Sequence, residues 1–110
     1  MTDEQASDLT MRDVLIAAAE ELPAIRRTDE DGILTFAAGA TSFSALAGER
    51  AEFLLDPMVA GAALRTPDTE PSVRGSEWVA FEPATLDDAA VDRAEAWFLS
   101  AYRRAVKMAS

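Results

Sequence analysis

The stretch DGILTFAAGATSFSALAGERAEFLLDP, residues 31–57, decides the fold of this chain. It holds three short segments in which apolar and polar residues alternate, as is typical of half-buried β-strands. Gly39-Ala40-Thr41 and Gly48-Glu49-Arg50 separate the segments, and connections this short join antiparallel neighbours. The stretch therefore predicts an antiparallel meander with strands at residues 33–38, 42–47 and 51–55.

The second of these strands indicates how the sheet is covered. Alternation places Phe43, Ala45 and Ala47 on one face and Ser42 and Ser44 on the other. One face of the sheet is therefore expected to meet water, as antiparallel sheets commonly do. The other face needs an apolar cover, which the flanking segments supply as helices.

The segment before the meander predicts a helix followed by a connection. Thr10 and Asp13 have the spacing of a capping box, and apolar residues recur at helical intervals until Pro23. Residues Arg26–Asp31 are charged and end in the turn signal Asp31-Gly32. We expect them to form a loop that leads into the first strand.

The segment after the meander predicts a helix, a hairpin and a long final helix. Asp56-Pro57 is a helix start, and this helix is expected to end near Arg65. Gly75-Ser76 is expected to join two strands, and the long helix is expected to open at Thr85. The hairpin strands are expected at Val73–Arg74 and Glu77–Glu82, and the apolar stripe of the long helix at Ala90, Val91, Ala94, Trp97, Phe98, Ala101, Tyr102 and Ala105. The order α-β(3)-α-β(2)-α predicts an α+β two-layer sandwich, in which helices pack on one face of an antiparallel five-stranded sheet.

Length and composition indicate one domain. The 110 residues contain 49% hydrophobic residues, enough for a core, and we expect a flexible acidic leader at residues 1–9 before a single domain at 10–110. No signal-peptide pattern is found at the start, and the apolar runs are shorter than the roughly 20 residues that a membrane helix needs. We therefore expect a cytoplasmic protein that does not enter a membrane.

The residue types exclude many kinds of active site. The chain has no histidine and no cysteine, so the commonest proton shuttle and the thiolate nucleophile are missing. Asp29-Glu30-Asp31-Gly32 resembles part of a calcium loop, but position 38, where that loop needs a glutamate, is Ala38. We therefore assign no catalytic, cofactor-binding or metal-binding residue. Metal binding or hydrolysis by carboxylates alone is kept as a third hypothesis.

The charge distribution suggests two contact surfaces. The formal net charge is -10, yet residues 93–110 hold four bases and one acid. Trp78 beside Arg74 is a candidate contact surface if the indole is exposed. The candidate nucleic-acid contacts are Arg65, Arg74, Arg103, Arg104 and Lys107.

The order and spacing of the apolar and turn residues resemble those of the MmcQ/YjbR family of small bacterial proteins. The resemblance covers about Met11–Val106 and rests on Leu22-Pro23, Leu34-Thr35-Phe36, Gly39, Phe43, Asp56-Pro57, Glu77-Trp78-Val79 and Ser100-Ala101-Tyr102. It implies a two-layer sandwich also described as like secretion chaperones, and a DNA-binding role assigned to family members on structural analogy. Where the family pattern has a lysine after Gly39, this chain has Ala40 and Thr41.

The functional expectation combines these signals. We expect a non-enzymatic binding module of the MmcQ/YjbR type, with an unknown protein or small molecule as its partner and no cofactor. The alternative is DNA binding through the basic C-terminal helix, which the net charge of -10 disfavours because phosphates repel an acidic domain.

Overall fold

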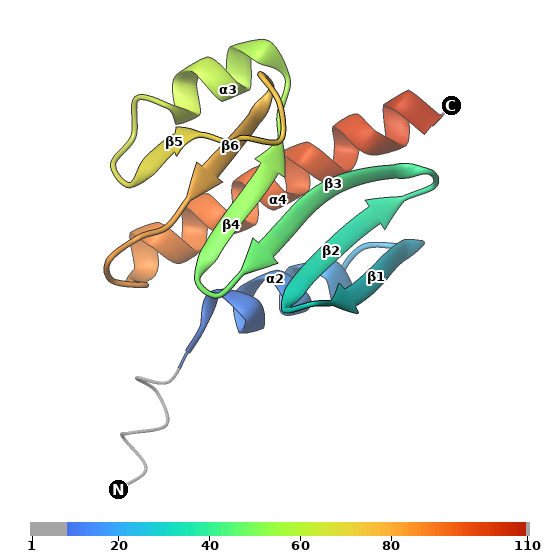
Figure 1. The fold of residues 1–110 in the computed structure, drawn as a ribbon, viewed down its shortest axis with the longest axis horizontal. Coiled ribbons are helices and arrows are strands. Elements are labelled where there is room, and N and C mark those ends of the chain that lie inside the picture. Colours follow the sequence, from blue (N-terminus) through green and yellow to red (C-terminus); the bar gives the residue numbers. More distant parts are fainter. Residues whose placement is uncertain (1–8, 110) are drawn as a thin grey trace, which may run out of the picture.

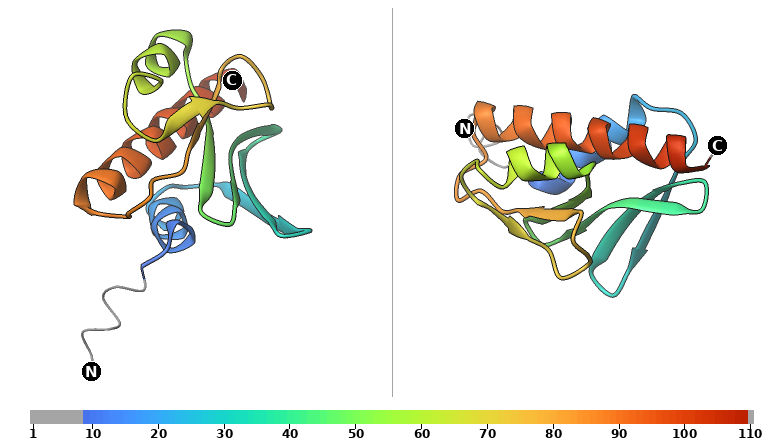
Figure 2. Two further views of the ribbon diagram at one scale, coloured as in Figure 1. Left: turned by 60° about the vertical axis from the view of Figure 1, so that its left-hand side comes forward. Right: turned by 90° about the horizontal axis from the view of Figure 1, so that it is seen from above.

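The computed structural model describes residues 9–109, in which three helices cover one face of a six-stranded sheet (Figures 1 and 2). The elements are α2 (Met11–Glu20), β1 (Ile25–Glu30), β2 (Ile33–Ala38), β3 (Thr41–Ala47), β4 (Arg50–Leu54), α3 (Pro57–Ala63), β5 (Thr69–Pro71), β6 (Trp78–Phe81) and α4 (Asp88–Ala109). The strands lie in the order β1-β2-β3-β4-β6-β5, and all neighbours are antiparallel. The predicted two-layer α+β class is confirmed, with one strand more than expected. The leader expected at residues 1–9 lies outside the described residues, apart from Leu9.

The sixth strand is β1, and our expectation of a loop at Arg26–Asp31 was wrong. Asp31 and Gly32 both have positive φ, 55° and 79°, which gives the two-residue turn that suits a hairpin. β1 therefore pairs with β2 from Glu30 opposite Ile33 to Ile25 opposite Ala38. As an edge strand, β1 is exposed along nearly its whole length, so its sequence lacks the apolar alternation that marks an inner strand.

The hairpin expected around Gly75-Ser76 is also different in the structure. β5 is formed by Thr69–Pro71 rather than by Val73–Arg74, and residues 72–77 form a loop before β6. Val73 is 99% exposed and contributes nothing to the sheet. Pro71 is tolerated because β5 is the other edge strand, where one side of the backbone needs no hydrogen-bond partner.

An extra residue in β3 changes which side chains face the core. Phe36 pairs with Ser44, but the next residue of β2, Ala37, pairs with Ser42, so Phe43 is inserted as a bulge. Ser44 consequently shares a face with Phe36 and is fully buried, where its hydroxyl donates to the Glu52 carbonyl at 3.0 Å. The expected simple alternation along this strand was therefore wrong beyond Phe43.

The aromatic core lies between the sheet and α4. The ring of Phe98 on α4 packs edge to face against Phe36 at 5.0 Å and Phe43 at 5.2 Å between centroids. The preceding residue of the helix, Trp97, packs against Phe81 at 5.0 Å between ring centroids. The predicted apolar stripe of the last helix thus fills the space over the inner strands. Figure 2 shows α4 lying over the sheet.

The capping signals predicted the start of one helix correctly and the start of another three residues too early. The predicted capping box is present at α2, where the Asp13 N–H donates to Thr10 Oγ1 at 3.2 Å and the Thr10 N–H donates to Asp13 Oδ2 at 3.1 Å. The last helix begins at Asp88 rather than near Thr85. There the Ala90 N–H donates to Asp87 Oδ1 at 2.9 Å, so Asp87 is the side chain that caps it.

Candidate functional site

The predicted neighbours Arg74 and Trp78 do lie together, on the face of the sheet away from α4. The guanidinium carbon of Arg74 is 5.4 Å from the centre of the Trp78 ring, a cation–π geometry. Trp78 is half-buried, and a Cβ added at Gly75 would lie 3.3 Å from the indole. The indole is therefore covered in part by its own loop.

Arg74 is also bound to Glu52 of β4. Its Nε donates to Glu52 Oε1 at 2.6 Å, and the hydroxyl of Ser72 donates to Glu52 Oε2 at 2.6 Å. The Arg74 backbone N–H completes the group by donating to the Ser72 hydroxyl at 3.0 Å. Glu52 is only 12% exposed, so its carboxylate holds the loop before β6 against the sheet. The Arg74–Trp78 pair is thus a loop clamp as well as a predicted contact surface.

Glu52 is expected to make part of the stability depend on pH. Burial alone would raise the pKa of Glu52, but the hydrogen bonds from Ser72 and Arg74 outweigh burial and lower it from its ordinary value of 4.5. A carboxyl with a lowered pKa stabilises the fold above its unfolded pKa, and this contribution is lost as the pH falls through the folded pKa. Glu52→Gln should therefore cost about 1–2 kcal/mol at neutral pH, and the cost should shrink below about pH 4.5.

Urea unfolding at about pH 7 and about pH 3 measures this difference. Glu82→Gln is the matched control, because Glu82 undergoes the same change of charge and lies exposed 3.8 Å from Arg50. A Glu52→Gln cost that is equal at the two pH values would contradict the assignment.

Three of the five candidate nucleic-acid contacts line one groove, and the other two do not. Arg103, Arg104 and Lys107 line a surface groove of about 700 Å³ beside α4, together with Asp56. Arg65 follows α3 and does not line this groove, and Arg74 is bound to Glu52.

Arg104 is bound inside the protein. Its guanidinium donates to the Leu55 carbonyl and to Glu77, and its Nε is 3.5 Å from Asp56 Oδ1. Its side chain is only 16% exposed, so it joins α4 to the end of β4 and the start of β6. Arg103 and Lys107 are then the exposed bases in that groove, and a nucleic-acid surface stays a prediction with few charges to support it.

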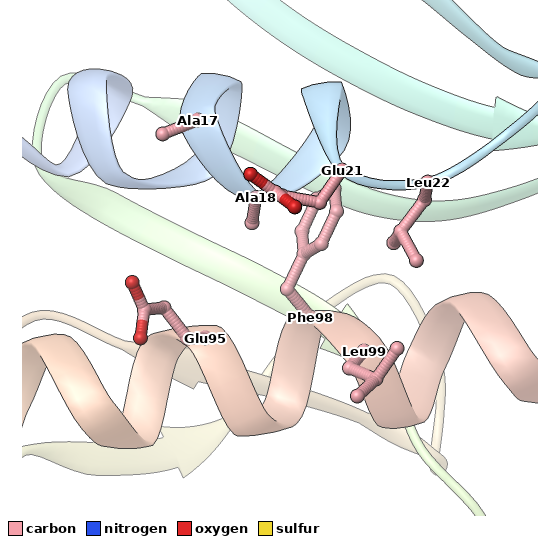
Figure 3. A pocket seen from close by; sticks show the side chains of 7 residues that line it. All are labelled: Ala17, Ala18, Glu21, Leu22, Glu95, Phe98 and Leu99. Atoms are coloured by element: carbon pink, nitrogen blue, oxygen red, sulfur yellow. The ribbon is translucent and has the colours of Figure 1, made fainter.

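The hollow that sequence reasoning missed lies between α2 and α4. It is a surface groove of about 400 Å³. The order of the labelled residues in Figure 3 shows that the two helices are parallel along it. Ala17 and Ala18 leave space on the α2 side, and the ring of buried Phe98 lies between the helices. Leu22 and Leu99 form an apolar end of the groove.

Two carboxylates stand on this apolar groove. Glu21 comes from the end of α2 and Glu95 from α4, and both residues are exposed. Within residues 9–109 neither carboxylate has an ion pair, whereas Glu52, Glu70 and Glu77 each contact an arginine. The groove therefore offers an apolar surface next to two negative charges that no described side chain pairs with.

A faint signal for the groove is visible in the sequence. The buried face of α2 is formed by Met11, Val14 and Leu15, which leaves the alanines at 17 and 18 at the side of the helix. Small residues at the side of a helix indicate space, but they do not show which helix lies across it. The parallel packing of α2 and α4 joins residues more than 70 positions apart, as the 2.9 Å bond from the Tyr102 hydroxyl to the Pro23 carbonyl shows.

Two further features bear on the kind of site. Within the described part of the chain, no group of three or more acidic, histidine or cysteine side chains is placed to hold a metal ion. No helix between residues 9 and 109 is long and apolar enough to cross a membrane. Comparison with protein-family models, with curated proteins and with solved structures finds no match for this chain.

Proposed function

We propose that this protein is a non-enzymatic binding module of the MmcQ/YjbR type whose α2–α4 groove binds a cationic amphipathic segment of a protein partner. The observation that carries the proposal is that Glu21 and Glu95, which form no ion pair within residues 9–109, lie on an otherwise apolar groove. An apolar side chain of the partner fits beside Leu22 and Leu99, and its lysine or arginine side chains fit the two glutamates. The lack of histidine and cysteine supports a binding role over catalysis.

The spacing along α4 favours a helical partner. Glu95 and Leu99 are four residues apart, which is about 6 Å along a helix axis at about 1.5 Å per residue. A partner helix with a basic residue and an apolar residue four positions apart reproduces this spacing, and helices dock in grooves between other helices in this way. The groove is also open along the helices, whereas small-molecule sites usually enclose most of their ligand.

The test is a titration with a labelled model peptide. The probe is a helical peptide of about 18 residues, made of leucine and lysine with all leucines on one face. We expect Glu21→Lys with Glu95→Lys to weaken binding at least about tenfold, since each attraction is replaced by a repulsion. Ala17→Trp should also weaken binding, because the indole fills the groove without a change of charge.

Two controls separate the groove from general acidity. Glu20→Lys with Asp92→Lys makes the same change in net charge on the same two helices, at positions that do not line the groove. A peptide of the same composition with scrambled leucine positions tests whether the apolar face matters. Equal losses in the two double variants, or equal binding of both peptides, would show attraction to an acidic protein and overturn the proposal.

A further inference from the structure

We propose that the protein forms a homodimer in which β1 pairs with β1 of a second copy, so that the two sheets become continuous. β1 is the first strand of the sheet, and Figure 1 shows it at the border with no other described element beyond it. The opposite border ends in β5, which has three residues and includes Pro71. β1 is therefore the one long open edge of the described sheet, with six residues.

The charges of β1 are antisymmetric about its centre. Its sequence from residue 26 is Arg26-Arg27-Thr28-Asp29-Glu30, with two bases before Thr28 and two acids after it. Antiparallel pairing of two copies centred on Thr28 places Arg26 opposite Glu30 and Arg27 opposite Asp29. Opposite charges directly across a strand pair stabilise the pairing, and like charges destabilise it. An edge protected against self-pairing would carry one sign of charge, because like charges would then meet in every register.

The backbone restricts the register independently of these charges. A two-residue turn with positive φ at Asp31 and Gly32 closes with a hydrogen bond between Glu30 and Ile33. In an antiparallel ladder the bonded pairs alternate, so the N–H and C=O of Arg27 and Asp29 are directed to the open edge, and those of Thr28 toward β2. Two copies can therefore exchange backbone hydrogen bonds only when odd-numbered residues face odd-numbered residues.

Among the central registers that satisfy this rule, one matches the charges. A pairing centred on Arg27 opposes two arginines, and a pairing centred on Asp29 opposes two aspartates. The pairing centred on Thr28 places Arg27 of each copy opposite Asp29 of the other, and these two pairs exchange four backbone hydrogen bonds. Together with the two Arg26–Glu30 pairs, they give four pairs of opposite charges. The backbone alternation and the charge order thus select the same register.

The neighbouring contacts are compatible with this dimer. Asp29 already lies 2.9 Å from Arg12 Nη2, and both side chains are about half exposed, so its carboxylate can accept from a second arginine. Directly opposed residues share a face of a sheet, and the Thr28-centred register therefore puts the helices of both copies on the same side. The α2–α4 grooves of the two copies would open on one common side.

Charge-swap variants test the dimer. The chain has a mass of 11.8 kDa, so light scattering or sedimentation at about 100 μM and low salt should show about twice that mass. Arg26→Glu and Glu30→Arg each oppose like charges, and each should raise the dissociation constant at least about tenfold. An equimolar mixture of the two variants restores both attractive pairs and should recover the dimer. Both variants leave the Arg12–Asp29 ion pair intact.

A backbone variant gives an independent readout. Arg27→Pro removes an N–H that faces the open edge, which a monomer tolerates and a strand-paired dimer does not. Circular dichroism checks that this variant is folded. If it is unfolded, the equimolar mixture of the two charge-swap variants decides whether the dimer forms through β1. A wild-type protein that stays monomeric at about 1 mM, a dimer that survives both single variants, or a mixture that stays monomeric would overturn the proposal. Each result is independent of peptide binding in the groove, which the Arg26 and Glu30 variants should leave unchanged.

Discussion

Replacing Phe98 with alanine is expected to lower the free energy of unfolding by about 3–5 kcal/mol, the usual cost of deleting a buried aromatic ring. Phe98 is fully buried and packs edge to face against both Phe36 and Phe43, so its loss removes two ring contacts and leaves a cavity. A domain of this size should then melt roughly 12–20 °C lower. Urea and thermal unfolding at neutral pH measure both quantities.

Two controls accompany the Phe98 variant. Met58→Ala removes a large apolar side chain that is 88% exposed, and it should change the free energy of unfolding by less than about 0.5 kcal/mol. Phe98→Leu keeps most of the buried volume and should cost clearly less than alanine. A Phe98→Ala cost near that of Met58→Ala would mean that α4 does not pack on the sheet as described.

Arg104→Met is expected to cost about 2–3 kcal/mol, because it leaves charged and polar groups without a donor. The Arg104 guanidinium donates to Glu77 and to the Leu55 carbonyl, and methionine keeps the apolar stem but no donor. The end of β4 and the start of β6 are also joined without Arg104, by the 2.9 Å hydrogen bond from the Leu55 N–H to the Glu77 carbonyl. We therefore expect a folded but less stable protein.

The neighbouring arginine is the matched control. Arg103→Met makes the same substitution one residue earlier, at an exposed position, and should change the stability by less than about 0.5 kcal/mol. The comparison uses urea unfolding at one pH and one salt concentration. Equal costs at positions 103 and 104 would show that the internal contacts of Arg104 contribute little.

The sequence predicted those elements whose signals are local. The capping box of Thr10 and Asp13 lies within one helical turn, and the apolar stripe that contains Trp97 and Phe98 repeats within one helix. For the hairpin of β1 and β2, the sequence predicted the turn at Asp31-Gly32 and the second strand. β1 itself was missed, since an edge strand with both faces exposed can be charged throughout.

The remaining errors depend on contacts between distant residues. Residues 72–77 form a loop rather than a tight hairpin, and Glu52, some 20 positions earlier in the chain, holds that loop through Ser72 and Arg74. Arg104 was predicted as a nucleic-acid contact, but its guanidinium donates to Leu55 and Glu77 of the same chain. The groove between α2 and α4 likewise requires knowledge of which helices pack side by side. The small residues at the side of α2 are a faint local signal for the groove, but the partners in all three arrangements lie far apart in the sequence.

The position of α4 at the end of the element order has a consequence for synthesis on the ribosome. All six described strands precede α4 in the chain, and the rings of Phe36, Phe43 and Phe81 rely on this helix for their cover. A nascent chain therefore exposes an apolar sheet face until α4 has emerged, at a few to about 20 residues per second. Aggregation of unfinished chains, rather than of the finished protein, is the hazard that this arrangement creates.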